Sequence, residues 1–150
     1  MRVYARGGDR MADTRAVAVK IRQLLLEIEE GREIDADEVR RLKRIKIPPW
    51  VHTTAQGVLA GYDERERALR REDGAPVVLQ EYRRINRAID NAVLAATEDC
   101  SQRVTDMLLR DMIERQGYYG SLLADMMSEY KYYEYKRTAT VYVAAKLYLI

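Results

Sequence analysis

The sequence predicts an all-α protein, a helical bundle with a C-terminal helix-turn-helix and no sheet. Apolar residues recur every three or four positions through most of the chain, which is the period of an α-helix. Capping residues and glycines stand at the expected ends of these periodic segments. A chain of 150 residues is also long enough to bury a core without disulfides or metal ions.

The first predicted helix begins at Asp13, and residues 1–12 before it are expected to form a flexible tail. Asp13 suits an N-cap, and Gly31 suits the left-handed residue that often follows a helix. Between them, apolar residues lie at helical spacing at Val17, Ile21, Leu24, Leu25 and Ile28.

The second predicted helix begins near Asp35. Asp35 and Glu38 have the spacing of a capping box, and Pro48-Pro49 ends the helix because a proline ring cannot continue it. The end of this helix, RRLKRIK at residues 40–46, is a basic cluster. We interpret the cluster as a solvated face balanced by the acidic residues before it, and contact with a polyanion is the alternative.

An irregular stretch separates the two halves of the chain. The segment IPPWVHTTAQG, residues 47–57, contains the strongest helix-breaking residues and is the best candidate for a boundary. A polar helix ending at Gly74 is expected after it. Residues 13–75 are therefore predicted to form an N-terminal helical region with a proline-containing loop.

Residues 76–150 are predicted to form a separate domain that folds without the N-terminal half. Pro76 suits the first position of a helix of about 20 residues that ends near Thr97. Ser101 is the expected cap of the next helix, and Gly117 its end.

The last part of the chain has the layout of a helix-turn-helix. Ser121 is expected to cap a short helix of about two turns, and a brief turn at Met127–Ser128 precedes a final helix from Glu129 to Tyr148. A long helix, a short helix, a turn and a final helix follow one another in the order that this motif requires.

The final helix has two different faces. One face is predicted to be core, with Lys146 reaching outward at its edge, and contains Tyr132, Tyr135, Ala139, Tyr142 and Val143. The residues predicted to contact DNA are on the opposite face and at the start of the helix: Ser128, Glu129, Tyr130, Lys131, Tyr133, Glu134, Lys136 and Arg137. Tyrosines beside lysines can lie against a sugar–phosphate backbone or stack on a base, but a protein interface or a plain surface remains an alternative.

Several short elements in the last quarter of the chain form a recognisable pattern. They are Met107-Leu108, Leu123-Ala124 with Met127, Ser128, Tyr132-Tyr133 with Lys136, and Ala139 with Ala144. In this order they resemble the C-terminal part of ArpU and RinA type regulators of phages from Gram-positive bacteria, which have a helix-turn-helix like that of sigma-70 region 4. The helix at residues 82–96 resembles the family helix before the motif more loosely, and residues 1–75 carry no specific match.

The resemblance implies a sequence-specific DNA-binding transcription regulator of phage late genes, encoded near the packaging genes. Double-stranded DNA is the implied partner, and host RNA polymerase and a second copy of the chain are further candidates. Glu129 and Glu134 depart from the basic helix that phosphate binding favours, but a carboxylate can accept from a cytosine amino group. A small terminase subunit, a ring-forming adaptor for DNA packaging, is the alternative function, and its ring would show in the molecular mass.

Other function classes receive little support from the sequence. The single histidine, His52, is expected in a loop, and the single cysteine, Cys100, is expected to be a small, partly buried thiol. Neither has neighbours at metal-ligand or catalytic spacing, so we predict no enzyme, no metal and no cofactor. The net charge of +2 alone implies no polyanion partner. No apolar segment suits a signal peptide or a membrane span, so the cytoplasm is the expected compartment.

Overall fold

The computed structural model describes the backbone of residues 2–43 and 47–150, and side chains from residue 15 onward within these ranges. The described chain contains helices and no strand, so the predicted all-α class is confirmed. The α-helices are α1 (Arg2–Glu29), α2 (Ala36–Lys43), α3 (Pro49–Ala60), α4 (Tyr62–Arg71), α5 (Pro76–Ala96), α6 (Gln102–Glu114) and α7 (Glu129–Lys146). Two 3₁₀-helices, η1 (Tyr118–Gly120) and η2 (Leu122–Asp125), lie between α6 and α7.

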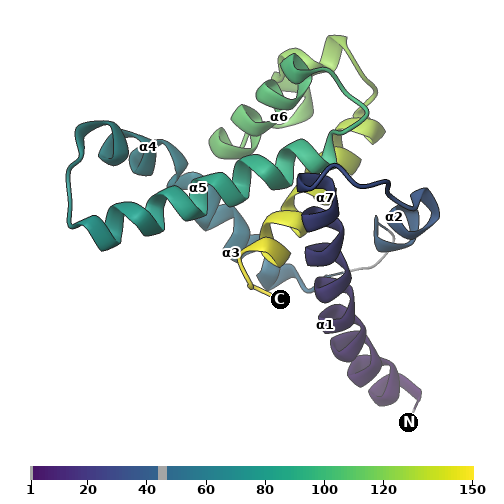
Figure 1. Cartoon of the computed structure of the whole chain (residues 1–150). Coiled ribbons are helices and arrows are strands. Elements are labelled where there is room, and N and C mark those ends of the chain that lie inside the picture. Colours follow the sequence, from purple (N-terminus) through teal and green to yellow (C-terminus); the bar gives the residue numbers. More distant parts are fainter. Residues whose placement is uncertain (1, 44–46) are drawn as a thin grey trace.

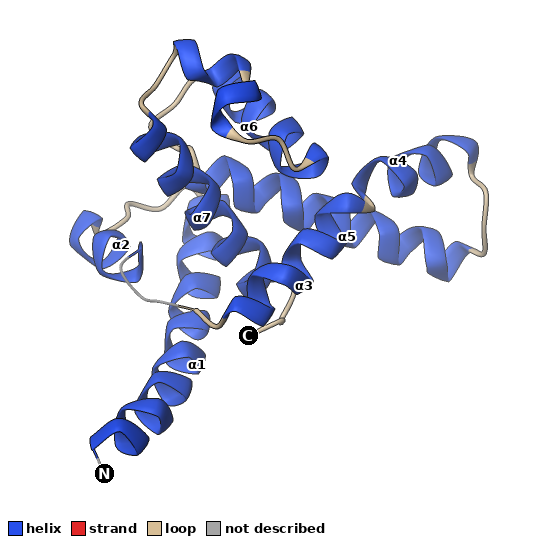
Figure 2. Cartoon of the chain, turned by 180° about the vertical axis from the view of Figure 1, so that it is seen from behind, coloured by secondary structure: helices blue, strands red, loops and turns tan. Residues whose placement is uncertain are grey.

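Helix α7 is the central element of the fold. Each residue from Thr138 to Ala145 is buried, because α1, α3 and α5 all pack against this half of the chain's last helix. The two cartoon views show α7 enclosed by these helices (Figures 1 and 2). The N-terminal half of α7 is buried on one side, at Tyr132 and Tyr135, and its other side is open to solvent.

One continuous core joins the two halves of the chain. Val17 and Ile21 of α1 and Val51 and Leu59 of α3 belong to the same cluster of buried residues as the apolar residues of α5, α6 and α7. This packing contradicts the expected division at residue 75. The helices of the C-terminal half do not enclose α7 by themselves, and α1 and α3 complete its burial.

The stretch predicted to be irregular is helix α3, so this prediction was wrong. Pro49 stands in the first turn, where no backbone N–H is needed for an intrahelical bond. Val51, Ala55 and Leu59 follow at intervals of one turn and are all buried. His52 is consequently a half-buried helical residue and not a loop residue. Burial, followed by the charge of Arg137, lowers the pKa of its imidazole.

Helix α1 begins at Arg2, so the start predicted at Asp13 is wrong and residues 2–12, expected to be a tail, are helical. No proline interrupts this segment, and its three arginines and two alanines favour a helix, whereas Gly7 and Gly8 oppose one. Gly31 adopts the left-handed conformation predicted for the residue after the helix, with φ of 71°.

Helix α2 begins as predicted, but its capping box is incomplete. Asp35 Oδ1 accepts a hydrogen bond of 3.0 Å from the backbone N–H of Asp37. The carboxylate of Glu38 instead forms ion pairs with Lys20 of α1 and Arg41 of α2. The helix was expected to continue through residues 44–46, which lie outside the described residues.

The polar helix predicted to end at Gly74 is interrupted at Gly61, where α3 ends and α4 begins. The buried side chain of Asn86 fixes α4 on α5, since its Oδ1 accepts from Arg65 at 2.7 Å and its Nδ2 donates to the carbonyl of Tyr62 at 3.1 Å. Helix α4 and the first turns of α5 project away from the core as an arm (Figure 1).

The predicted helices at α5 and α6 are confirmed. Pro76 occupies the first turn of α5, which ends at Ala96. Ser101 caps α6, and its Oγ accepts from the backbone N–H of Val104 at 3.3 Å. The left-handed residue that ends α6 is Arg115, with φ of 56°, and not Gly117.

Candidate nucleic-acid interface

The short helix predicted before the final helix is replaced by η1 and η2. Ser121 is its cap as predicted, but Oγ accepts from Leu123 N, two residues ahead, at 3.0 Å. The hydroxyl of Tyr118 lies 3.1 Å from the carbonyl oxygen of Ala124 and 2.8 Å from that of Met127. These carbonyls are therefore satisfied by a side chain, so the segment can be tighter and shorter than an α-helix. The order of helix, short helical segment, turn and helix is nevertheless present.

A carboxylate links this short segment to its neighbours. Asp111 Oδ2 on α6 accepts from the hydroxyl of Tyr132 on α7 at 2.9 Å and also from the hydroxyl of Ser121. The ring of Tyr132 is fully buried. Asp111 therefore joins α6, the 3₁₀ segment and α7, and it fixes the direction in which the first turns of α7 emerge.

Replacing Asp111 with alanine is expected to lower the free energy of unfolding by about 1–3 kcal/mol, because the hydroxyl of Ser121 loses its acceptor and that of Tyr132 keeps only the carbonyl of Gln116, at 3.1 Å. Urea titration followed by far-UV circular dichroism measures this loss. Asp106→Ala on the exposed side of the same helix is the matched control and is expected to cost less than about 0.5 kcal/mol. Equal losses in the two variants would contradict the linking role of Asp111.

The core face predicted for α7 is confirmed. Tyr132, Tyr135, Ala139, Tyr142 and Val143 are all buried. Lys146 lies at the edge of this face, as predicted, and its ammonium is 3.0 Å from Glu29 on α1.

The beginning of α7 presents a different set of side chains to solvent. Ser128 caps the helix, and its Oγ accepts from the backbone N–H of Lys131 at 3.2 Å. Tyr130 is 77% exposed and Lys131 is also exposed. The carboxylate of Glu129 accepts from the hydroxyl of Tyr119 at 3.0 Å. These four residues of the predicted interface therefore lie together at the accessible end of the helix.

Three other residues of the predicted interface have internal contacts. The hydroxyl of Tyr133 accepts from the backbone N–H of Tyr118 at 3.3 Å, and the ammonium of Lys136 donates to the carbonyl of Gln116 at 2.7 Å. Burial lowers the pKa of Lys136. The guanidinium of Arg137 donates to the carbonyl of Lys43, the last residue of α2. These groups hold neighbouring segments against α7, a role that the sequence analysis did not assign to them.

An open groove of about 800 Å³ separates α2 from the first turns of α7. Its lining residues are Arg40, Lys43, Glu129, Tyr130, Tyr133, Glu134 and Arg137. Five of these seven residues belong to the predicted interface, while Arg40 and Lys43 come from the basic cluster at residues 40–46. The sequence showed both features but not their proximity, because the two segments are about 90 residues apart in the chain.

Metal-ligating side chains are scattered through the described parts of the chain. No three His, Cys, Asp or Glu side chains lie together there as a metal site would require. Cys100 is half-buried, as predicted, and burial raises the pKa of its thiol. None of the described helices has the length and apolar character needed to cross a membrane.

No protein-family model matches this chain, and no curated protein or solved structure is significantly similar to it. The groove and the first turns of α7 are therefore the features from which we infer a function.

Proposed function

We propose that this protein is a sequence-specific DNA-binding regulator that reads the major groove of double-stranded DNA with the first turns of α7. The exposed start of α7 supports this proposal, because it is capped by Ser128, held in place by Asp111 and free of core contacts at Tyr130 and Lys131. A single helix held in this way and projecting from a compact core can enter a major groove.

The regulatory role is supported by the resemblance of residues 107–150 to ArpU and RinA type regulators. A regulator of phage late genes must bind near promoters, and host RNA polymerase is then the protein partner that this role would require. The groove beside α7 supplies both hydrogen-bonding side chains for base edges and positive groups for phosphates, which is the combination that specific DNA binding needs.

Selection of bound duplexes from a random DNA library tests the proposal directly. The expected result is an enriched motif whose binding weakens as salt concentration rises, because phosphate contacts release counterions. Recovery of unenriched sequences from repeated rounds would contradict sequence-specific binding. Light scattering on the same sample separates a monomer or dimer from the large ring that a small terminase subunit would form.

Glu134 is expected to contribute to base discrimination. Its carboxylate is half-buried in the groove wall and is suited to accept from a cytosine amino group. Glu134→Ala is therefore expected to change the preference at one base pair of the selected motif by about 1–3 kcal/mol. Competition binding against all single-base variants of the motif measures this preference.

Glu64→Ala is the matched control for Glu134→Ala. Glu64 is an exposed glutamate on α4, which does not line the groove. Its removal changes the net charge by the same amount, so it reports any general electrostatic effect. An identical base preference profile in wild type, Glu134→Ala and Glu64→Ala would show that Glu134 does not read a base.

A further inference from the structure

The groove beside α7 has chemically different walls. The α2 wall contributes Arg40 and Lys43, whereas the carboxylates of Glu129 and Glu134 are on the α7 wall. Two tyrosine rings, those of Tyr130 and Tyr133, lie on the α7 side and are 77% and 45% exposed. Arg137 is the cation of the α7 wall, and it donates to the carbonyl of Lys43. The α2 wall therefore has two cations and no lining carboxylate, while the α7 wall has the two carboxylates that can accept hydrogen bonds from base edges.

A helix that enters the major groove has a phosphate backbone on each side of it. An element packed alongside such a helix therefore meets a backbone and not the base edges. Helix α2 lies across the groove from the first turns of α7, because Arg40 and Lys43 line it together with Glu129 and Tyr130. Farther along α7, Arg137 donates to the carbonyl of Lys43. Arginine and lysine are the side chains that most often neutralise phosphates.

We propose that α2 is a second DNA-contacting element, in which Arg40 and Lys43 bind the phosphates of the DNA strand beside the base-reading turns of α7. The inference rests on the proposed function. It assigns affinity to the α2 wall and base preference to the α7 wall, so the two walls have separable effects on binding. It also gives a function to the described part of the basic cluster at residues 40–46.

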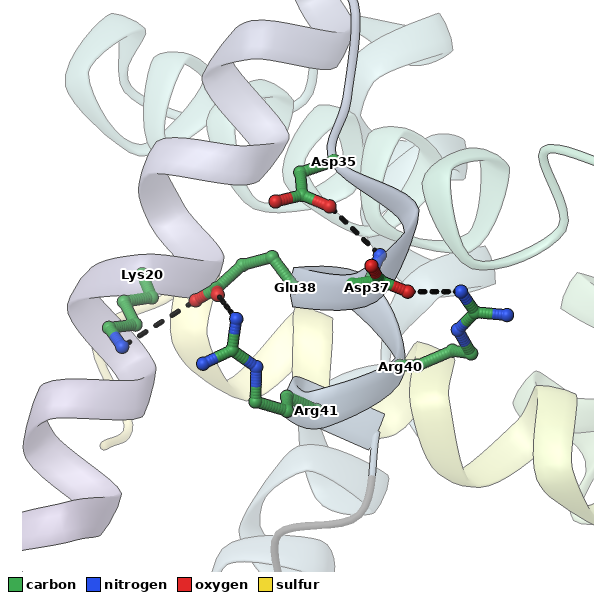
Figure 3. A network of polar contacts seen from close by, with 6 residues as sticks. All are labelled: Lys20, Asp35, Asp37, Glu38, Arg40 and Arg41. Atoms are coloured by element: carbon green, nitrogen blue, oxygen red, sulfur yellow. Dashed lines mark hydrogen bonds and ion pairs between the residues drawn. The ribbon is translucent and has the colours of Figure 1, made fainter.

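The neighbouring arginine of α2 has a different environment. Arg41 is 3.1 Å from Glu38, which is also 3.5 Å from Lys20 of α1, so Arg41 belongs to a network on the α1 side. Figure 3 shows Arg40 and Arg41 pointing in different directions, with Arg41 turned toward Glu38 and Arg40 paired with Asp37. Arg41 does not line the groove.

The position of α2 is fixed from both sides. The ion pairs of Glu38 attach it to α1, and Leu42 is buried in the core. The guanidinium of Arg137 binds its C-terminal carbonyl at Lys43. These three contacts hold the backbone of α2 beside α7, so less motion of the helix itself has to be lost when DNA binds.

The test measures the affinity of the selected duplex as a function of salt for wild type, the double variant Arg40→Gln/Lys43→Gln and the control Arg41→Gln. The double variant is expected to reduce the slope of log affinity against log salt by about two and to weaken binding about tenfold or more. The order of preference among single-base variants of the duplex should not change. Arg41→Gln removes a charge from the same helix, but its slope is expected to stay close to that of wild type.

Asp37→Asn is expected to change DNA affinity in the opposite direction to the double variant. Removing this carboxylate frees Arg40 from its partner, so affinity for the selected duplex is expected to rise roughly two- to fivefold.

Arg40 is exposed, so the single variant Arg40→Gln should keep the fold even if the half-buried Lys43 tolerates substitution poorly. Arg40→Gln is expected to lower the slope of log affinity against log salt by about one. Circular dichroism confirms the fold of each variant.

The outcomes separate this inference from the proposed function. If wild type binds a selected duplex and the folded Arg40→Gln variant has an unchanged salt slope, α2 does not contact phosphates, and α7 remains the reader. If the Arg41→Gln control lowers the slope as much as Arg40→Gln does, the change in slope comes from the lower net charge and not from a contact of Arg40 with a phosphate, and the inference also fails. If wild type binds no duplex, or binds single strands equally well, both proposals are overturned.

Discussion

A fragment of residues 76–150 is expected to remain largely unfolded on its own. The second half of α7 is buried against α1 and α3 as well as α5, so removing the first 75 residues exposes the helix at the centre of the core. Buried residues of α7 would then face water on the side that α1 and α3 cover in the whole chain. Burial of apolar surface is the main favourable contribution to folding, and the fragment loses much of it.

Far-UV circular dichroism and urea titration of the fragment measure this effect. The expected result is weak helical signal without a cooperative transition. A fragment of residues 15–150 is the matched control, since it keeps every core residue among those whose side chains the structure describes and is expected to unfold cooperatively. Cooperative unfolding of the 76–150 fragment would show instead that its helices form an independent domain.

The sequence was sufficient to predict the helices whose apolar residues form a regular stripe. In α6, Val104, Leu108 and Met112 recur at intervals of one turn, and all are buried. Ser101 and Ser128 begin their helices as predicted, because a hydroxyl that accepts a backbone N–H is a local interaction. Local periodicity and local capping therefore determined these parts of the fold.

Helix α3 shows why other parts of the fold were not predicted. Pro48 and Pro49 indicated a loop, but a proline in the first turn is compatible with a helix. The apolar stripe of Val51, Ala55 and Leu59 is short and includes the small residue Ala55, so the sequence alone shows only a weak helical period. The stripe is buried because α6 and α7 pack against α3. The expected loop at Pro48-Pro49 was also the basis for dividing the chain into two domains.

The candidate interface was predicted only in part for a related reason. Helical spacing identifies which residues of α7 point away from the core, but it does not show what lies opposite them. The contacts of Lys136 with Gln116 and of Arg137 with Lys43 join segments 20 and 94 residues apart. Such long-range contacts depend on the packing of the whole chain. Because of them, two residues that were predicted to contact DNA have partners within the protein.

Tyr135→Ala is expected to lower the free energy of unfolding by about 3–5 kcal/mol, as truncation of a large buried aromatic does. Tyr135 is 8% exposed, and its hydroxyl donates to Asp99 Oδ2 at 2.7 Å. Burial, followed by its hydrogen bonds to Cys100 and Asp99, raises the pKa of this phenol. Tyr135→Phe keeps the ring and loses only the hydroxyl, so it should cost about 1 kcal/mol.

Tyr133→Ala is the matched control, because it removes a tyrosine from the same helix two residues earlier. Tyr133 is 45% exposed, and its one hydrogen bond, from Tyr118 N, is 3.3 Å long, so the expected loss is below about 1 kcal/mol. Urea titrations of the three variants at one temperature give the comparison. Equal losses for Tyr135→Ala and Tyr133→Ala would mean that both rings stabilise the fold to the same extent. In that case Tyr133 would hold the 3₁₀ segment in place, and the exposed surface of α7 available to DNA would be limited to its first turn.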